Sequence, residues 1–406
     1  MANLVLKDVS KLYPSGALAL CKVNLEVSDK EFIAVIGAEK SGKTTLLRVI
    51  AGLDDATSGQ IIIGGKDMTG VHPKDRDVAM IFRNDTLYPS INVYENMAYG
   101  LKIRKTPQVA IEQRVKAAAE ILGLTDVLTR KPKMLTAAQR QRVALGRAIA
   151  REPKLYLLDD PIAGLDDNLK AQMRSIIVSL QARMEGTFIY ATKNVNEALT
   201  MATRVVVLRE GVIQQVDTPA NLYDYPANAY VGLLVGSPAM NMVSGATLEE
   251  VNGALVAAYK GVNFAISPEV AARLEDKQAY VGTGRKVIVG IRPEDVIWGE
   301  GEDAAVTATE EADGRLYAEC QLGGDLSLLA LAPAGTAKGG AAKIKPDGAR
   351  IYLFDGQTRL TLLSRDGGYE QTGYSDASVQ PMAYEEEEQL KTSLKPAPPA
   401  KDKKRR

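Results

Sequence analysis

Several residue types that would place this chain in a specialised class are rare or missing. Cys21 and Cys320 are the only cysteines among 406 residues. Two are too few for a disulfide framework, and each is expected to be a small buried side chain. No run of about 18 apolar residues occurs, so no membrane-spanning helix is predicted. The first residues, MANLVLKDVSKLY, lack the pattern of a signal peptide.

An excess of either charge is also missing, because 50 basic and 50 acidic residues give a formal net charge of zero. Nucleic-acid-binding domains typically carry a basic excess, so we expect no nucleic-acid partner. Histidine is rarer still. His72 is the only one, and it precedes a Pro-Lys turn, where a surface position is expected. We therefore predict a cytosolic protein that reaches a membrane only through a partner.

A phosphate-binding sequence occupies residues 37–44, which read GAEKSGKT. It follows an apolar run at 31–36, predicted as a buried strand, and precedes helical spacing at 44–51, which is the context such a loop requires. Backbone N–H groups at the start of that helix can surround phosphates. We expect Lys43 to contact the β- and γ-phosphates and Thr44 to bind Mg²⁺. The predicted nucleotide-binding residues of this loop are Gly37, Ala38, Glu39, Lys40, Ser41, Gly42, Lys43, Thr44 and Thr45.

A second short apolar run, 155–158, is also predicted as a buried strand, and it ends in Asp159-Asp160-Pro161. A carboxylate at the carboxyl end of a core strand is where enzymes with such a loop hold Mg²⁺. We therefore predict that Thr44 and Asp159 bind the metal, and that ATP and Mg²⁺ are the bound cofactors.

These motifs and the stretches around them resemble the ATP-binding subunits of ABC transporters, of the carbohydrate-importer type, over roughly residues 3–365. The resemblance implies that Tyr13 stacks on adenine. It also implies that two chains enclose two ATP molecules, each between the phosphate loop of one chain and the signature of the other. The matching stretches are specific in their order and spacing: KLYPSG (11–16), HPKDRDVAMIF (72–82), LYPSINVYENMAYGLK (87–102), LTAAQRQRVALGRAIAREPKLYLLDDP (135–161), AGLDDNLK (163–170), QQVDTPANLYDYPANAYVGLLVGSPAMN (214–241) and VGIRPEDV (289–296).

The chain departs from the family pattern at five positions that face the nucleotide. The signature LSGGQ becomes Leu135-Thr136-Ala137-Ala138-Gln139, and the resemblance still assigns Thr136 to Gln139 to nucleotide contact. The other four replacements are Arg83 for the glutamine of the Q-loop, Asp160 for the catalytic glutamate, Lys193 for the switch histidine and Lys40 for the middle glycine of the phosphate loop.

These departures predict that hydrolysis is strongly reduced or absent. Asp160 is one methylene shorter than glutamate, and a base withdrawn by about 1 Å can cost about a hundredfold in rate. Lys193 keeps a donor but cannot relay hydrogen bonds as a neutral imidazole does. Arg83 cannot bind Mg²⁺, whereas a glutamine carbonyl can. Ala137 and Ala138 place Cβ atoms where glycines allow close approach, although their N–H groups remain.

Three regions are predicted. Residues 1–235 alternate strands and helices, which favours an α/β fold with a parallel sheet, here a P-loop ATPase domain with a helical subdomain at about 86–150. Residues 236–366 contain the strand-like runs ALVAAY, KVIVGI, RLYAECQL, ARIYLF and RLTLL, which predict a small β-barrel. The resemblance implies an oligonucleotide-binding-like regulatory domain there. Residues 367–406 are predicted to be a disordered charged tail.

Two functions are left open. The first is the energising ATPase of a carbohydrate-type importer, working slowly. The second is a catalytically inactive ATP-binding pseudoenzyme that regulates or supports an intact paralogue. The resemblance implies transmembrane permease subunits, an extracytoplasmic solute-binding protein as an indirect partner, and a homodimer or a heterodimer with a paralogous ATPase. Residues 84–91 resemble the permease-binding surface, so we expect a peripheral protein at the cytoplasmic face of the membrane.

Overall fold

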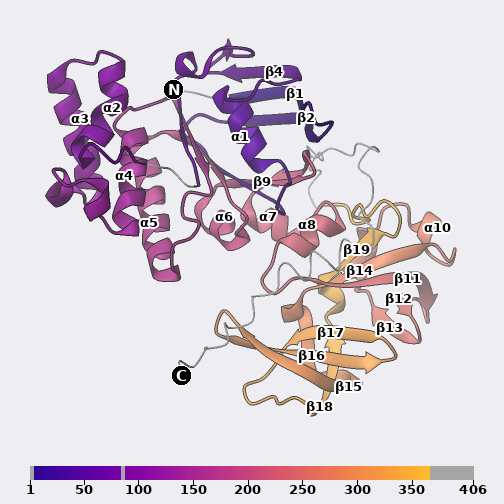
Figure 1. Ribbon diagram of the computed structural model, residues 1–406. Coiled ribbons are helices and arrows are strands. Elements are labelled where there is room, and N and C mark those ends of the chain that lie inside the picture. Colours follow the sequence, from indigo (N-terminus) through magenta and orange to yellow (C-terminus); the bar gives the residue numbers. More distant parts are fainter. Residues whose placement is uncertain (1–3, 84–86, 366–406) are drawn as a thin grey trace. The chain divides into compact units, whose positions relative to one another are not determined.

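The computed structural model describes residues 4–83 and 87–365 (Figure 1). The chain divides into two compact units, residues 1–219 and 220–406. The boundary predicted from the sequence lies near residue 235. The tail predicted at 367–406 lies outside the described residues.

A six-stranded sheet carries the phosphate loop and the aspartate pair of the first unit. Its strands are β3 (Phe32–Ile36), β6 (Val78–Ile81), β7 (Leu155–Asp159), β8 (Thr187–Ala191), β9 (Arg204–Arg209) and β10 (Val212–Asp217). Their order is β10-β9-β3-β8-β7-β6, and all neighbours run parallel except β10 and β9. Every residue of β3, β7 and β8 is buried, as expected for parallel strands that are covered on both faces.

A second sheet of four antiparallel strands is absent from the prediction. It contains β1 (Leu4–Leu12), β2 (Leu18–Val27), β4 (Ser58–Ile63) and β5 (Lys66–Asp67), in the order β2-β1-β4-β5. Helix α1 (Lys43–Ala51) follows the phosphate loop, and its buried residues share one core cluster with residues of both sheets. The start of α1, where phosphates would bind, is therefore held by packing on two sides.

Helices supply the rest of the first unit. They are α2 (Val93–Ile103), α3 (Gln108–Leu122), α4 (Ala137–Ile149), α5 (Asp167–Met184) and α6 (Val195–Met201), with α7 (Pro219–Asp224) at the unit boundary. Helices α2, α3 and α4 pack on one another, within the range predicted for the helical subdomain. Among the described residues, every helix is too short or too polar to cross a membrane.

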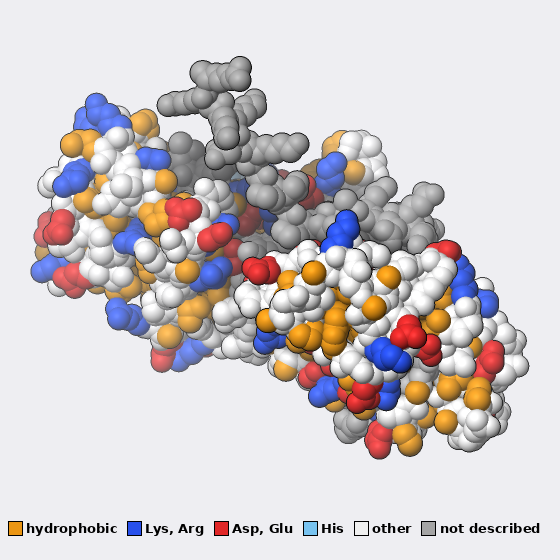
Figure 2. All heavy atoms as spheres, turned by 90° about the horizontal axis from the view of Figure 1, so that it is seen from below, with side chains coloured by type: hydrophobic (Ala, Val, Ile, Leu, Met, Phe, Trp, Pro, Cys, Tyr) orange, Lys and Arg blue, Asp and Glu red, His pale blue; other side chains and the backbone are white. Residues whose placement is uncertain are grey.

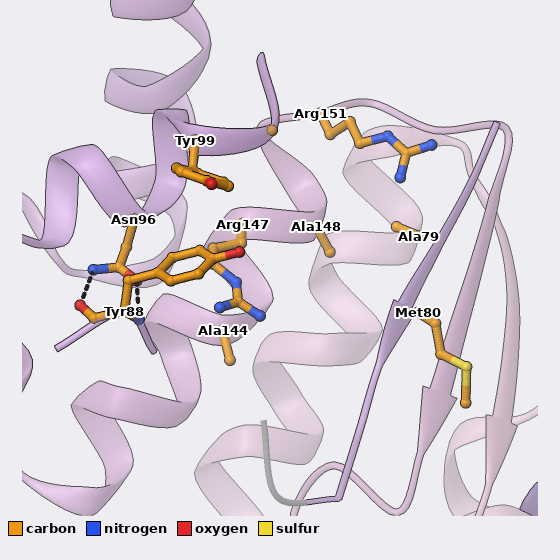
Figure 3. A pocket seen from close by; sticks show the side chains of 10 residues that line it. Ala79, Met80, Tyr88, Asn96, Tyr99, Ala144, Arg147, Ala148 and Arg151 are labelled. Carbon is orange, nitrogen blue, oxygen red and sulfur yellow. Dashed lines mark hydrogen bonds between the residues drawn. The ribbon is translucent and has the colours of Figure 1, made fainter. Parts of the chain in front are cut away.

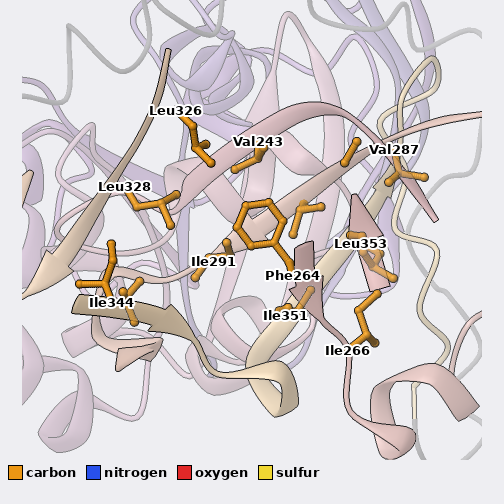
Figure 4. Close-up of a cluster of buried hydrophobic side chains, with 14 of the residues drawn as sticks. Val243, Phe264, Ile266, Val287, Ile291, Leu326, Leu328, Ile344, Ile351 and Leu353 are labelled. Carbon is orange, nitrogen blue, oxygen red and sulfur yellow. The ribbon is translucent and has the colours of Figure 1, made fainter. Parts of the chain in front are cut away.

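The second unit contains two antiparallel sheets around a common apolar core, which includes Val243, Phe264, Ile291, Leu328 and Ile344 (Figure 4). One sheet has the order β13-β12-β11-β14-β19, with β11 (Asn241–Val251), β12 (Ala254–Tyr259), β13 (Val262–Ala265), β14 (Lys286–Ile291) and β19 (Ile351–Asp355). The other has the order β17-β16-β15-β18, with β15 (Val296–Ala312), β16 (Arg315–Gly323), β17 (Leu326–Leu331) and β18 (Ala341–Pro346). Three short helices are α8 (Ala229–Leu234), α9 (Pro268–Ala272) and α10 (Lys277–Tyr280).

Four of the five strand-like runs predicted for this unit form strands. The fifth, RLTLL at 359–363, makes only isolated bridges at Leu360, Thr361 and Leu363. Surface charges of both signs are interspersed among the described residues on the face drawn in Figure 2, as expected from the balanced composition.

A buried carboxylate fixes the turn that follows β19. The Asp355 side chain is 2% exposed, and its Oδ2 accepts hydrogen bonds from Tyr280 Oη at 2.7 Å and Arg285 Nη2 at 2.6 Å. Its Oδ1 accepts from the backbone N–H groups of Gln357 and Thr358. Burial by itself raises the pKa of Asp355, but these donors outweigh burial and hold the pKa at about 2, below the ordinary value of 3.8.

We expect Asp355→Asn to lower the free energy of unfolding of the second unit by about 2 kcal/mol near pH 6. Because the folded pKa lies below the unfolded pKa, ionised Asp355 stabilises the fold above about pH 4, and this contribution is lost as the pH falls towards 2. The difference between wild type and variant should therefore shrink over that range. Urea unfolding followed by the fluorescence of Trp298 measures it, because this single tryptophan packs against the core of the second unit.

The control is Asp325→Asn, which removes an exposed carboxylate paired with Lys260 and should not change stability measurably. An Asp355→Asn effect of equal size at about pH 3 and pH 7 would contradict the assignment of that pKa.

Candidate nucleotide-binding site

The phosphate loop joins the end of β3 to the start of α1, as the sequence predicts. A Cβ atom at Gly37 would lie 2.0 Å from the backbone oxygen of Leu208, and one at Gly42 would lie 2.6 Å from the oxygen of Ala19. Both glycines also have positive φ, at 154° and 106°. Only glycine fits these two positions without strain. Lys40, where the family pattern has glycine, adopts φ 65°, so this loop holds a lysine in the left-handed region.

The Lys43 side chain forms hydrogen bonds with other residues of the phosphate loop. Its Nζ donates to the backbone oxygens of Gly37 at 2.8 Å and Ala38 at 2.7 Å, and to Ser41 Oγ at 3.1 Å. Burial lowers the pKa of Lys43 to about 8, although the nearby carboxylates of Asp159 and its neighbours act in the opposite direction. A partly buried ammonium whose hydrogen-bond acceptors are all neutral is a strong binding group for an anion that enters the loop.

Thr44 and Asp159 meet at the end of β7. Thr44 Oγ1 donates to Asp159 Oδ1 at 3.0 Å. Burial raises the pKa of Asp159, and the hydrogen bond from Thr44 lowers it in part. A carboxylate and a hydroxyl oxygen this close, beside a phosphate loop, are the hard oxygen donors that Mg²⁺ prefers, so the two residues fit the metal. The distance confirms that the two predicted metal ligands come together, although they lie 115 residues apart in the chain.

Asp160, at the position of the catalytic glutamate, is paired with Arg83. The Arg83 Nε atom lies 3.5 Å from Asp160 Oδ2, and the two side chains are 53% and 17% exposed. The Asp160 backbone has φ 48°, and its N–H donates to the Ala191 oxygen at 2.8 Å, which fixes the residue against β8. Two of the family departures therefore contact each other.

Lys193, at the position of the switch histidine, pairs with the phosphate loop. Its Nζ lies 3.3 Å from Glu39 Oε1, and both side chains are largely exposed. The backbone beside Lys193 is anchored by Glu197, which is 3% exposed and accepts hydrogen bonds from Tyr190 Oη and Thr192 Oγ1, both at 3.0 Å. The Lys193 ammonium is therefore largely exposed, while the turn that carries it is held in place.

The residues at the signature position, Thr136 to Gln139, form the N-terminal cap and first turn of α4. Thr136 Oγ1 accepts a hydrogen bond from Gln139 N at 3.2 Å, and Gln139 Oε1 accepts from Thr136 N at 3.0 Å, which makes a capping box. Ala137 and Ala138 lie in the first turn, where backbone N–H groups have no intrahelical acceptor. Gln141 Nε2 donates to the Pro161 backbone oxygen, which ties α4 to the segment after Asp160. The side chains of Thr136 and Gln139 thus cap the helix end, and the N–H groups of Ala137 and Ala138 have no acceptor within the helix.

Tyr13 is held by an acidic residue that sequence analysis misses. Its Oη donates to Asp54 Oδ2 at 2.9 Å and lies 3.4 Å from Thr45 Oγ1. Arg48 binds both oxygens of the same Asp54 carboxylate. Lys11 Nζ lies 5.1 Å from the centroid of the Tyr13 ring. Nothing in the spacing of residues 13, 48 and 54 signals this network.

A separate pocket of about 200 Å³ lies between β6, α2 and α4 (Figure 3). The rings of Tyr88 and Tyr99 lie 4.4 Å apart, and the Arg147 guanidinium lies 5.7 Å from the Tyr88 centroid. Asn96 is fully buried and bonds the Tyr88 backbone through both ends of its amide, at 2.8 and 3.1 Å. On the side of the pocket formed by Ala79, Arg151 Nη1 donates to the Val78 backbone oxygen at 2.8 Å (Figure 3). The lining residues are Ala79, Met80, Tyr88, Asn96, Tyr99, Gly100, Ala144, Arg147, Ala148 and Arg151.

Comparisons with known proteins agree with this architecture. The family model described as ABC transporter matches residues 20–163, and the MalK OB fold domain matches residues 236–296. The oligosaccharides import ATP-binding protein MsmX of Bacillus subtilis is 46% identical over 296 residues, which cover 73% of this chain and 79% of that protein. The diacetylchitobiose uptake system ATP-binding protein MsiK of Streptomyces coelicolor is 40% identical over 387 residues, covering 89% and 100%.

A solved structure extends the agreement to three dimensions. CbiO1 from Clostridium perfringens, part of the ABC transporter complex CbiONQ, superposes with a TM-score of 0.51 at 26% identity, covering 54% of this chain and 89% of that one. The phosphate loop, the aspartate beside it, both family models and near full-length relatives agree, and the chain belongs to the ATP-binding subunits of ABC transporters.

Proposed function

We propose that this chain is the ATP-binding subunit of a sugar importer, held at the cytoplasmic face of the membrane by permease subunits, and that it hydrolyses ATP slowly. The observation that carries the proposal is the complete phosphate loop beside Asp159, in a chain 40% identical along its length to a diacetylchitobiose uptake protein. An extracytoplasmic solute-binding protein would be an indirect partner, because it contacts the permease and not this chain.

Mg-ATP binding is assigned to the loop 37–45. The Lys43 ammonium would leave its three loop acceptors for the β- and γ-phosphates, since charge-assisted hydrogen bonds to phosphate are stronger than bonds to neutral carbonyls. Thr44 and Asp159 would hold Mg²⁺, which neutralises phosphate charge when it is bound. Tyr13 would stack on adenine, with its ring fixed through Asp54.

Slow hydrolysis is assigned to the pair of Asp160 and Lys193. Asp160 is one methylene shorter than the glutamate of the family pattern, which withdraws the base from the water by about 1 Å. Lys193 is a flexible cation paired with Glu39, and it lacks the acceptor nitrogen of a neutral imidazole. Both groups would act on the same water, so the two replacements together would lower the rate of hydrolysis more than either one alone.

Closure of two chains on ATP would use the start of α4. The N–H groups of Ala137 and Ala138 have no acceptor within the capped helix, and a helix N-terminus favours an anion. The partner chain could be identical or a paralogous ATPase. The two Cβ atoms, absent from the glycines of the family signature, oppose close contact and weaken this closure.

The pocket beside β6 suits a permease segment. The exposed rings of Tyr88 and Tyr99 and the Arg147 guanidinium surround a concave surface, and aromatic and arginine side chains are enriched at interface hot spots. Tyr88 of this pocket lies five residues after Arg83, within the stretch 84–91 whose sequence resembles the permease-binding surface.

The Arg83–Asp160 ion pair also favours a second function. If the pair persists with ATP bound, the base is never released. The chain would then be a pseudoenzyme that binds ATP and regulates or supports an intact paralogue.

Replacing the loop lysine tests the binding assignment. Lys43→Ala should lower ATP affinity at least about tenfold, because one charge-assisted contact to phosphate is lost. Isothermal titration calorimetry on the full chain measures it. Lys66→Ala, which removes an exposed lysine of β5, is the matched control and should bind as wild type does. Wild-type protein that binds no ATP, or a Lys43→Ala variant with unchanged affinity, would refute the site.

Restoring the family residues tests the hydrolysis proposal. Wild-type turnover should be about a hundredfold or more below the ordinary level of about 1 s⁻¹ or faster. Asp160→Glu with Lys193→His should raise turnover by more than the two single changes combined, since both groups act on one water. Phosphate release by the chain alone and with its permease is the measurement. Ordinary wild-type turnover would disprove the impairment, and turnover undetectable even with permease would select the pseudoenzyme.

Removing a pocket ring tests permease binding. Tyr99→Ala should weaken co-purification with the permease subunits about tenfold or more, without changing ATP affinity. Val109→Ala removes an apolar side chain of α3 that is more exposed than Tyr99 and lies outside the pocket, and it should have no effect. Equal permease recovery with both variants would exclude the pocket as the docking surface.

A further inference from the structure

Arg83 differs from the other cations of the nucleotide site in the partner it holds. The Lys43 ammonium bonds loop oxygens, and Lys193 pairs with the exposed Glu39. Arg83 instead lies 3.5 Å from Asp160, the carboxylate at the hydrolytic position. Asp160 follows Asp159 directly, and Asp159 contacts Thr44 of the phosphate loop. The guanidinium is therefore placed at the side of the site where a third phosphate would extend beyond the loop.

A guanidinium binds a carboxylate and a phosphate with the same forked donor geometry, so the two anions compete for it. The Arg83 side chain is 53% exposed, and a partly exposed ion pair costs little free energy to open. A γ-phosphate carries more charge than one carboxylate and would be held in place by Lys43 and the loop. ADP lacks that group and offers Arg83 no new partner.

We propose that Arg83 discriminates ATP from ADP by exchanging partners: it pairs with Asp160 when the site is empty or holds ADP, and with the γ-phosphate when ATP is bound. The inference rests on the proposed nucleotide binding at the loop. Asp160 would then have two states. In one its carboxylate is paired with Arg83, and in the other the binding of ATP has removed Arg83. The carboxylate is therefore free to act on water only when a γ-phosphate is present.

The test compares affinities rather than turnover. The full chain is titrated with Mg²⁺ and either ADP or a non-hydrolysable ATP analogue, as wild type and as Arg83→Gln, Arg83→Lys and Asp160→Asn. Arg83→Gln should lower analogue affinity about tenfold and leave ADP affinity unchanged, because only the γ-phosphate contact is lost. Arg83→Lys should recover part of the loss, since it restores the charge but not the fork.

The exchange itself predicts a coupling between Arg83 and Asp160. Asp160→Asn frees the guanidinium, so it should raise analogue affinity more than ADP affinity. That preference should disappear when Arg83→Gln is also present, which is a non-additive result expected of groups in contact. A preference that survives in the double variant would overturn the exchange.

Matched controls separate the possible failures. Arg114→Gln, on α3, removes an ion pair with Glu152 whose two side chains are also partly exposed. It should change the affinity for neither nucleotide. An unchanged ratio of analogue to ADP affinity in Arg83→Gln, while Lys43→Ala still weakens binding, would overturn this proposal and leave the nucleotide site intact. Loss of both affinities in Arg83→Gln with an unchanged melting temperature would also overturn it, since the guanidinium would then serve a shared phosphate. Wild type that binds neither nucleotide would refute the site itself.

Discussion

The close approach between the phosphate loop and β9 is the constraint on which the rest of the site depends. A Cβ at Gly37 would lie 2.0 Å from the Leu208 oxygen, so the chain can leave β3 only through a glycine. That exit directs the loop back over the start of α1, where Lys43 bonds the Gly37 and Ala38 oxygens. The same turn brings Thr44 to Asp159 at the end of β7. The packing of two sheets against α1 thus fixes the positions of Lys43, Thr44 and Asp159.

Charge is distributed differently here from the family pattern. Lys40, Arg83 and Lys193 stand where that pattern has a glycine, a glutamine and a histidine. Two of these cations have carboxylate partners in this structure, Asp160 and Glu39. Arg83 and Lys193 therefore each have a counter-ion within the site, whereas Lys43 contacts neutral oxygens. In the partner exchange proposed above, a triphosphate rearranges the Arg83 pair, which makes the site responsive to the charge of the ligand.

Sequence patterns predicted the parts of the site that depend on local order. The strand, loop and helix around residues 37–44, and the buried strand before Asp159, are local and were confirmed. The antiparallel sheet of β1, β2, β4 and β5 was missed, because its central pair, β1 and β4, is separated in the chain by β2, β3, the phosphate loop and α1. The Tyr13–Asp54 bond and the Arg83–Asp160 pair were also missed, since contacts between distant segments leave no periodic signal. The run at 359–363 has strand composition but makes only single bridges, because neighbouring segments, and not β-propensity alone, decide pairing.

Within residues 4–83 and 87–365, strand β6 lies at the end of the six-stranded sheet and pairs only with β7. An unpaired strand edge is a template on which a second chain can add its own strand, and such addition begins aggregation. Arg151 places its guanidinium on the Val78 oxygen of β6, so one acceptor of that edge is already used. Arg151 therefore lines the pocket and also occupies a backbone acceptor that an added strand would need. A substitution at Arg151 would be expected to reveal itself first in the solubility of the newly made chain.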